Sequence, residues 1–123
     1  MKTILLFEDD HVLLTAIEHQ LLMRGFNVLA VRTVEEGLSH LEGSTPIDAV
    51  WLDHYLLGKQ NGLDLVVRLK EGEGTKNIPI FVVSNSAGSE HMASYLRLGV
   101  SQYYTKADYD LSQIIDDIVY TLT

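Results

Sequence analysis

Five residues whose side chains can do chemistry stand at the ends of short apolar runs of this sequence. They comprise three carboxylates, one hydroxyl and one ammonium: Glu8, Asp9, Asp53, Ser84 and Lys106. The run before Asp53 is the most informative, because residues 47–52 are mostly bulky and end abruptly at the carboxylate. Such a run is typical of a strand covered on both faces, and open α/β folds bind ligands at the carboxyl ends of such strands. Asp53 is therefore the predicted chemical centre of the chain.

The chemistry that this set of residues supports is phosphoryl transfer to a carboxylate. Three carboxylates close together raise one another's pKa unless a cation neutralises them. Mg²⁺ suits them because it prefers oxygen ligands and keeps several waters. One carboxylate can then act as a nucleophile toward phosphorus, with Lys106 spreading the phosphoryl charge and the Ser84 hydroxyl donating to a phosphoryl oxygen. Each residue alone is weak evidence, because an acid after a strand usually caps a helix, so it is their convergence that favours a site.

Bringing these residues together requires a particular order of strands and helices. Five apolar runs have strand character, and they cover residues 2–7, 26–31, 47–53, 78–84 and 103–106. Apolar residues at helical spacing follow each run, over residues 10–25, 33–41, 61–71, 89–98 and 110–122. This alternation predicts an α/β fold, a flavodoxin-like (βα)5 three-layer sandwich with a five-stranded parallel sheet of order 2-1-3-4-5. The carboxyl ends of all the strands would then lie along one edge.

Local signals mark where several of the predicted helices begin and end. Asp10 and Asn61 stand where N-cap residues belong, and Gly25 is a predicted C-terminal stop. Asp110 with Gln113 has the spacing of a capping box. The helix after Asp10 is also expected to bury a broad apolar face made by six residues: Val12, Leu13, Ala16, Ile17, Leu21 and Leu22.

Composition and charge limit the kind of protein this is. The 123 residues are 46% hydrophobic and 21% charged, which fits one globular domain, and no output domain is expected. The formal net charge of -8 disfavours nucleic acid as a direct partner, because phosphate contacts need clustered Lys and Arg. No apolar run is long enough to span a membrane and there is no cysteine, so a cytoplasmic location is expected.

The sequence resembles the receiver domain of two-component response regulators over essentially its whole length. Five motifs carry the resemblance: residues 4–10 (ILLFEDD), 50–53 (VWLD), 61–62 (NG), 78–84 (IPIFVVS) and 103–106 (YYTK). The resemblance implies that Asp53 is the phosphoacceptor and that Mg²⁺ is the cofactor. It also implies that Asp9 and Asp53 bind the ion directly, together with the backbone carbonyl of Tyr55, while Glu8 acts through water.

Further roles follow from the same resemblance. Lys106 matches the lysine that pairs with the phosphoryl group, Ser84 the hydroxyl residue that moves toward it, and Tyr103 the aromatic whose rotamer reports the state. A histidine kinase or a histidine phosphotransfer protein would supply the phosphoryl group in a phosphorelay, and the domain would later hydrolyse its own aspartyl phosphate. Asn85 and Ser86 match positions that tune this dephosphorylation. A protein target would bind the face formed by the fourth helix, fifth strand and fifth helix, and a homodimer stays open.

Three departures from the family pattern concern the backbone around the site. Leu57 and Ala107 stand where receivers usually carry proline, and the segment between Asp53 and Gly62 is about one residue longer. A non-proline cis bond costs roughly 3 kcal/mol, so the bond before Ala107 is either trans or accompanied by strain. The departures motivate an alternative function, a phosphorylation-independent protein-interaction module on the same fold. A Mg²⁺-dependent phosphatase is less favoured, because Asp53 does not belong to an Asp-x-Asp motif and no insertion could form a substrate cap.

Several aromatic and histidine side chains near the predicted site have simpler expected roles. His11 and His54 flank the acidic residues, but only loop spacing links them, so both are expected to be ordinary exposed side chains. His91 is expected to lie on the surface of its helix. Trp51 is expected to be buried in the sheet, close enough to Asp53 for its fluorescence to report on the site. At least one of three helical residues is expected to enter the core: Met92, Tyr95 or Leu96.

Overall fold

One parallel sheet organises the chain, and its strand order is β2-β1-β3-β4-β5, as the alternation of elements predicted. The computed structural model describes residues 1–85 and 89–123. The strands are β1 (Thr3–Phe7), β2 (Asn27–Val31), β3 (Ala49–Leu52), β4 (Ile80–Ser84) and β5 (Gln102–Thr105). All neighbouring strands pair in parallel, so their carboxyl ends lie along one edge. The flavodoxin-like fold predicted from the sequence is confirmed.

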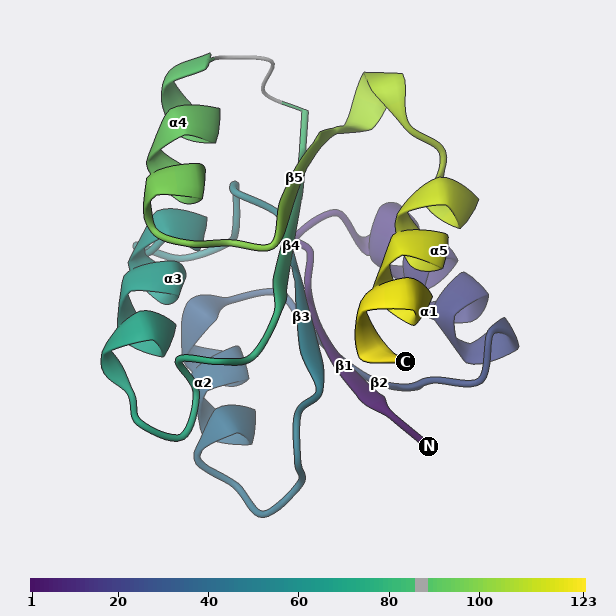
Figure 1. Ribbon diagram of the computed structural model, residues 1–123, viewed down its shortest axis with the longest axis horizontal. Coiled ribbons are helices and arrows are strands. Elements are labelled where there is room, and N and C mark those ends of the chain that lie inside the picture. Colours follow the sequence, from purple (N-terminus) through teal and green to yellow (C-terminus); the bar gives the residue numbers. More distant parts are fainter. Residues whose placement is uncertain (86–88) are drawn as a thin grey trace.

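Helices cover both faces of this sheet. In the described ranges they are α1 (His11–Met23), α2 (Val34–Leu41), α3 (Gly62–Glu71), α4 (Ser89–Arg97) and α5 (Leu111–Leu122). A short 3-10 helix, η1 (Lys106–Asp108), joins β5 to α5. Figure 1 shows α2, α3 and α4 on one face and α1 and α5 on the other. Within the described ranges, no helix has the length and apolar character needed to cross a membrane.

The sheet separates two apolar cores, one on each face. Trp51 of β3 packs on the side of α1 and α5, in a cluster that includes Ile17 and Ile118. Leu52, the next residue, points to the opposite face and joins a cluster that includes Tyr95 of α4. Trp51 and Tyr95 are both fully buried. Trp51 is thus buried as predicted, and Tyr95 is the member of its helical group that enters the core.

Side chains at the helix starts bind the first free backbone amides, as the local signals predicted. Oδ1 of Asp10 accepts from the backbone N–H of Leu13 at 3.1 Å, directly before α1. Asn61 and Asp64 form a reciprocal capping box at 3.2 and 2.9 Å, directly before and within α3. Gly25 has a φ of +90° and ends the turn after α1. These caps fix where α1 and α3 begin relative to the strands that precede them.

The apolar face predicted for α1 is wider than the one the helix buries. Leu14, Ile17 and Leu21 are buried against the sheet, whereas Val12 is 79% exposed and Leu22 is 53% exposed. A helix packed on a sheet buries one stripe of residues spaced three or four positions apart, and Val12 and Leu22 fall outside that stripe. The prediction of burial is therefore wrong for these two residues and also for Ala16, which is exposed.

Candidate functional site

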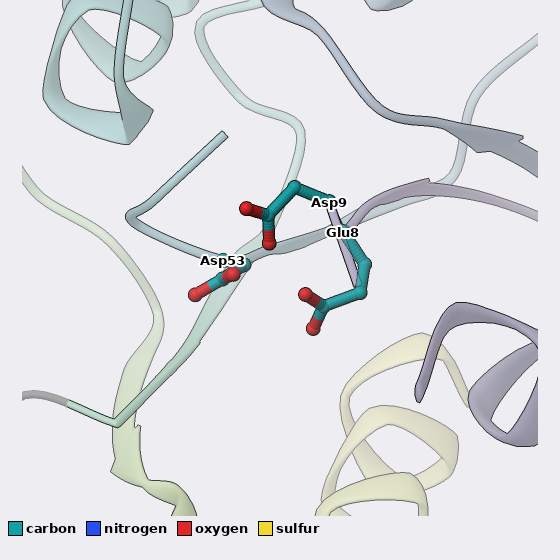
Figure 2. Close-up of side chains that lie close together, drawn as sticks. All are labelled: Glu8, Asp9 and Asp53. Atoms are coloured by element: carbon teal, nitrogen blue, oxygen red, sulfur yellow. The ribbon is translucent and has the colours of Figure 1, made fainter. Parts of the chain in front are cut away.

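Three carboxylates meet at the carboxyl edge of the sheet, between the ends of β1 and β3. Glu8 and Asp9 come directly after β1, and Asp53 comes directly after β3. Phe7 and Leu52 are partners in the parallel register, and the backbone N–H of Asp53 donates to the carbonyl of Phe7 at 3.0 Å. One oxygen from each carboxylate lies within 4.8 Å of the other two (Figure 2). Strand pairing therefore assembles the carboxylate cluster that the sequence predicted.

Lys106 brings a positive charge to this cluster from near the end of the chain. It follows β5 as the first residue of η1, and its Nζ lies 3.1 Å from Oε1 of Glu8 and 3.8 Å from Oδ1 of Asp53. The side chains are sheltered, with exposed fractions of 17% for Lys106, 1% for Glu8 and 5% for Asp53. Charges this sheltered are screened far less than a surface ion pair. Lys106 is thus held against two carboxylates.

The surroundings of Asp53 favour its protonated form. Burial raises the pKa of Asp53 to about 8, and the Glu8 carboxylate adds to the rise while Lys106 opposes it. With all acids ionised, three negative charges would face the single ammonium of Lys106. A hard divalent ion relieves this excess, and clustered carboxylate oxygens are the ligands that such an ion prefers. The residues present therefore fit Mg²⁺.

A cleft of about 580 Å³ opens over the carboxylates. Its lining comes from residues far apart in the chain: Glu8 to Leu13, Arg32, Asp53, Tyr55, Asn85 and Lys106. A more apolar hollow of about 440 Å³ adjoins it between α1 and α5, and Lys106 lines both. Asn85 is exposed at the cleft, whereas Ser86 lies outside the described residues. The cleft thus gives a reacting group access to the buried carboxylates from solvent.

Arg32 is a site residue that sequence reasoning missed. None of the site residues predicted from the sequence follows the second strand, yet Arg32 directly follows β2 at the same edge of the sheet. Its guanidinium donates to the backbone carbonyl of Asp9 through Nε at 3.1 Å and Nη2 at 2.8 Å. A charged residue directly after a strand was a signal available in the sequence. Arg32 holds the backbone of Asp9 and leaves the carboxylate of that residue to the cluster.

Ser84 and Tyr103 come from β4 and β5, the two strands that follow β3 in the sheet, and their side chains are connected to each other. Ser84 ends β4 and is fully buried, and a hydrogen bond joins its side chain to that of Tyr103. Burial raises the pKa of Tyr103, and this hydrogen bond opposes the rise. The Tyr103 ring lies 5.8 Å from the Tyr95 ring on α4, measured between centroids. The two residues expected to switch are therefore linked to α4 as well as to each other.

The loop after Asp53 is tied to the start of α2. The backbone N–H of Leu57 donates to the carbonyl of Arg32 at 3.1 Å, and Leu57 forms an isolated parallel bridge with Thr33. Gly58 follows with a φ of +91°, a conformation that glycine adopts without a steric penalty. A proline at position 57 would lack the N–H that makes this hydrogen bond. Leu57 thus lets the loop pair with the segment after β2.

The peptide bond between Lys106 and Ala107 is trans, because the described residues contain no cis peptide bond. They also contain no residue other than glycine with a positive φ. Lys106 nevertheless reaches Glu8 and Asp53 from its place in η1. Of the two alternatives raised by Ala107, the trans bond is the one found.

His54 is buried, which corrects the prediction of an exposed side chain. It is 3% exposed, and its Nδ1 shares a hydrogen bond of 2.6 Å with the hydroxyl of Tyr95. Its ring also packs on that of His91, which is half-buried and not a simple surface residue. The His54 ring therefore packs against α4, a helix much later in the chain. Loop spacing contains no signal for such a partner, whereas His11 is exposed as expected.

Comparisons with known proteins point to one family. Residues 4–118 match the family described as the response regulator receiver domain. The transcriptional regulatory protein CpxR of Klebsiella pneumoniae subsp. pneumoniae (strain HS11286) is 33% identical over 106 residues, which are 86% of this chain and 43% of that protein. The chain therefore spans less than half the length of this curated relative.

Solved structures share the fold over almost the whole chain. The phosphorylated cyanobacterial phytochrome response regulator RcpA is 26% identical with a TM-score of 0.81, covering 98% of this chain and 90% of that one. The Mn²⁺-bound form of response regulator Rcp1 is 20% identical with a TM-score of 0.83, covering 99% and 95% of the two chains. The second likeness concerns the fold alone.

Proposed function

Because this chain belongs to the response-regulator receiver family, we propose that Asp53 accepts a phosphoryl group in a two-component phosphorelay. The observation that supports this most directly is the position of Asp53, a buried carboxylate at a strand end with two more carboxylates and Lys106 around it. The donor would be a phosphohistidine on a histidine kinase or a phosphotransfer protein. Residues 1–123 would act as a single receiver domain in the cytoplasm, where such donors act.

The transfer would be a displacement at phosphorus by a carboxylate oxygen of Asp53. An O–P bond forms while the N–P bond to the donor imidazole breaks, and the electron pair of that bond stays on the nitrogen. Asp53 must be ionised to attack, although its pKa of about 8 favours the protonated form at neutral pH. Lys106, 3.8 Å from Asp53, would balance the charge that builds up on the phosphoryl oxygens.

Four groups would hold Mg²⁺: the carboxylates of Glu8, Asp9 and Asp53 and the backbone carbonyl of Tyr55. Asp9 and Asp53 would contact the ion directly and Glu8 through water, while Arg32 keeps the backbone of Asp9 in place. When bound, the ion supplies the positive charge that favours ionised Asp53 and neutralises phosphoryl oxygens during transfer. Tyr55 lines the cleft beside the carboxylates, which supports its part in this set.

The output would be a change on the face formed by α4, β5 and α5. Ser84 would move toward the new phosphoryl group, and Tyr103 would follow because the two side chains share a hydrogen bond. A protein target would recognise this face in one of the two states. A second copy of the chain is an alternative partner, and nucleic acid is not proposed as a direct one because the net charge is -8.

Acetyl phosphate and beryllofluoride, each with Mg²⁺, test the proposal. Acetyl phosphate should add one phosphoryl group to the wild type and none to Asp53→Asn, as read by intact mass. Lys106→Met should slow the modification by about 100-fold, the usual loss when one charge-stabilising group is removed. Lys76→Met is the matched control, because Lys76 pairs with Glu73 on the surface. Acetyl phosphate should modify this variant at the wild-type rate.

Two outcomes would contradict the proposal. One is modification of Asp53→Asn to the wild-type extent. The other is a wild-type protein that takes neither acetyl phosphate nor beryllofluoride. Full binding of a protein partner by Asp53→Asn would then support the phosphorylation-independent interaction module instead.

A further inference from the structure

Five aromatic side chains lie between the phosphoacceptor loop and α4. Two come from the loop, two from α4 and one from β5, and we call them the aromatic cluster: His54, Tyr55, His91, Tyr95 and Tyr103. The His54 ring is at its centre, with centroids 4.1 Å from His91, 4.6 Å from Tyr55 and 5.7 Å from Tyr95. The phosphoryl chemistry proposed above uses neither His54 nor any side chain of α4. The proposed phosphoryl transfer therefore assigns no role to the side chains of His54, His91 and Tyr95.

One hydrogen bond in the aromatic cluster connects the phosphoacceptor segment directly to α4. Nδ1 of His54 and the hydroxyl of Tyr95 are 2.6 Å apart, and the two residues are 3% and 0% exposed. His54 is the residue after Asp53, so a single peptide link separates this bond from the phosphoacceptor. Breaking a buried hydrogen bond is costly, because neither partner has water as a substitute. A displacement of His54 is therefore resisted unless α4 moves with it.

Gly62 at the start of α3 packs against the same hydrogen bond. A Cβ at this position would lie 2.3 Å from the Tyr95 hydroxyl and 3.2 Å from Cα of His54. The backbone N–H of Gly62 also donates to the carbonyl of His54 at 3.0 Å. His54 is thus held through its ring by α4 and through its carbonyl by α3, which leaves it little freedom to move alone.

The aromatic cluster also reaches the other side of the site. The ring of Tyr95 lies 5.8 Å from that of Tyr103, and the Tyr103 side chain is hydrogen-bonded to Ser84. Tyr95 therefore contacts both the residue after Asp53 and the pair expected to follow the phosphoryl group. No other residue of α4 among those described has ring contacts with both sides.

We propose that Tyr95 is a positioning residue that, through its hydrogen bond to His54, transmits phosphorylation of Asp53 to α4. The inference rests on the function proposed above and adds a second connection to the one through Ser84 and Tyr103. A phosphoryl group on Asp53 adds charge and bulk next to the peptide link to His54. The His54–Tyr95 hydrogen bond then makes α4 follow the loop, so that site and helix change state together.

Hydrogen exchange at the backbone amides of α4 tests the inference, measured with and without beryllofluoride and Mg²⁺. In the wild type, beryllofluoride should change these exchange rates by about fivefold or more, the lower end of ordinary coupling. Tyr95→Phe keeps the ring and removes only the hydroxyl. In this variant, the change that beryllofluoride causes in the exchange rates of α4 should fall below about twofold. Its beryllofluoride affinity, followed by Trp51 fluorescence, should stay within about tenfold of the wild type.

Two further variants separate coupling from simple loss of stability. Tyr104→Phe removes a hydroxyl that bonds to Asp117 on the opposite face of the sheet, so its α4 response should match the wild type. The double variant His54→Phe/Tyr95→Phe removes both partners and leaves no unsatisfied polar group. Its α4 response should equal that of Tyr95→Phe, because the two substitutions remove one shared interaction.

The outcomes distinguish the inference from the function on which it rests. A wild-type response of α4 in both Tyr95→Phe and the double variant would overturn the inference. So would a wild-type protein that binds beryllofluoride with no change at α4. A wild-type protein that does not bind beryllofluoride contradicts the proposed function, and the inference falls with it.

Discussion

Asp53 combines two properties that conflict at neutral pH. A nucleophile must be ionised, yet burial and the neighbouring Glu8 raise the pKa of Asp53 to about 8. Lys106 opposes this rise without cancelling it. A second positive charge is therefore needed before Asp53 can act, and the clustered oxygens of Glu8 and Asp9 are the groups that would recruit it. The expected requirement for Mg²⁺ therefore follows from the charges of four side chains: Glu8, Asp9, Asp53 and Lys106.

Without divalent ions, the unfolding free energy of Asp53→Asn should depend less on pH than that of the wild type. The pKa of Asp53 in the folded state, about 8, lies above its ordinary value of 3.8, so the folded state binds a proton more tightly than the unfolded state. The stability from this proton is present below about pH 4 and is lost as the pH rises toward 8. Asparagine cannot ionise, so between pH 5 and 8 the variant should lose less unfolding free energy than the wild type, by on the order of 3–4 kcal/mol.

Urea unfolding at several pH values, with a chelator present, measures this difference. A variant whose unfolding free energy falls with pH as steeply as that of the wild type would show that Asp53 is not the group responsible. Asp116→Asn serves as the control, because Asp116 is largely exposed and its pair with Arg24 lies on the surface.

The loop after Asp53 has Leu57 where a proline was expected from the resemblance, and its contacts explain how it keeps a defined place. Leu57 pairs with the segment after β2, and Gly62 is bonded to His54 at the start of α3. The loop is thus fixed at both ends, and the buried ring of His54 is covered from above by α4. These backbone bonds hold the loop in place without a proline at position 57.

Leu57→Pro should destabilise the domain although it restores the residue that the family usually carries. Proline has no N–H, so the hydrogen bond to the Arg32 carbonyl is lost and that carbonyl loses its partner in the loop. We expect a loss of about 1 kcal/mol in unfolding free energy, the usual net value of one such bond. Leu57→Ala keeps the N–H and should lose less. Greater stability of the proline variant in urea unfolding would contradict the importance of this pairing.

Gly62→Ala should destabilise the domain through contacts rather than through helix propensity. Its Cβ would lie 2.3 Å from the Tyr95 hydroxyl and 3.3 Å from the carbonyl oxygen of Asp53. Overpacking of this kind costs roughly 1–3 kcal/mol. Removing the hydroxyl relieves the shorter contact, so Gly62→Ala/Tyr95→Phe should recover part of the loss in urea unfolding.

Gly74→Ala provides the matched control, because no atom lies within 4 Å of a Cβ at that position. Its unfolding free energy should stay close to that of the wild type. Equal stability of Gly62→Ala and Gly74→Ala would mean that the helix start can shift away from α4 at little cost.

In the whole molecule, the carboxylate cluster and the helices expected to bind a target lie on different parts of one sheet. The carboxylates lie at the carboxyl edge, whereas the helices are divided between two faces, with α4 on one and α5 on the other (Figure 1). Trp51 and Tyr95 are buried in the cores of these opposite faces. Trp51 lies shortly before Asp53 in the chain, and the residue after Asp53 contacts Tyr95. A structural change at the carboxyl edge of the sheet can therefore reach the cores on both faces.

Mg²⁺ should stabilise the entire domain. An ion that binds only the folded state adds about 2.7 kcal/mol to the unfolding free energy at roughly 100 times its Kd. The melting temperature of the wild type should therefore rise with Mg²⁺ concentration, and Trp51 fluorescence should report binding because this side chain is buried two residues before Asp53. Asp9→Asn should weaken both responses. An equal rise in melting temperature with NaCl at matched ionic strength would indicate screening rather than binding.

The sequence alone was enough to predict the strand order and the meeting of Glu8, Asp9, Asp53 and Lys106. Both follow from local patterns, because each apolar run marks a strand and parallel strands end at the same edge. The resemblance to receiver domains assigned roles to these residues, and the family match confirms the family.

Only the tertiary structure decided which side chains are buried around that edge. Val12 and Leu22 are apolar yet exposed, whereas His54 is polar yet buried. The buried His54 side chain has the Tyr95 hydroxyl as its hydrogen-bond partner, and Tyr95 belongs to a helix that lies far from His54 in the sequence. Such a contact joins segments 41 positions apart and leaves no periodic signal in either one. Local patterns therefore determined where the carboxylates of this protein meet, and long-range packing decided what connects them to α4.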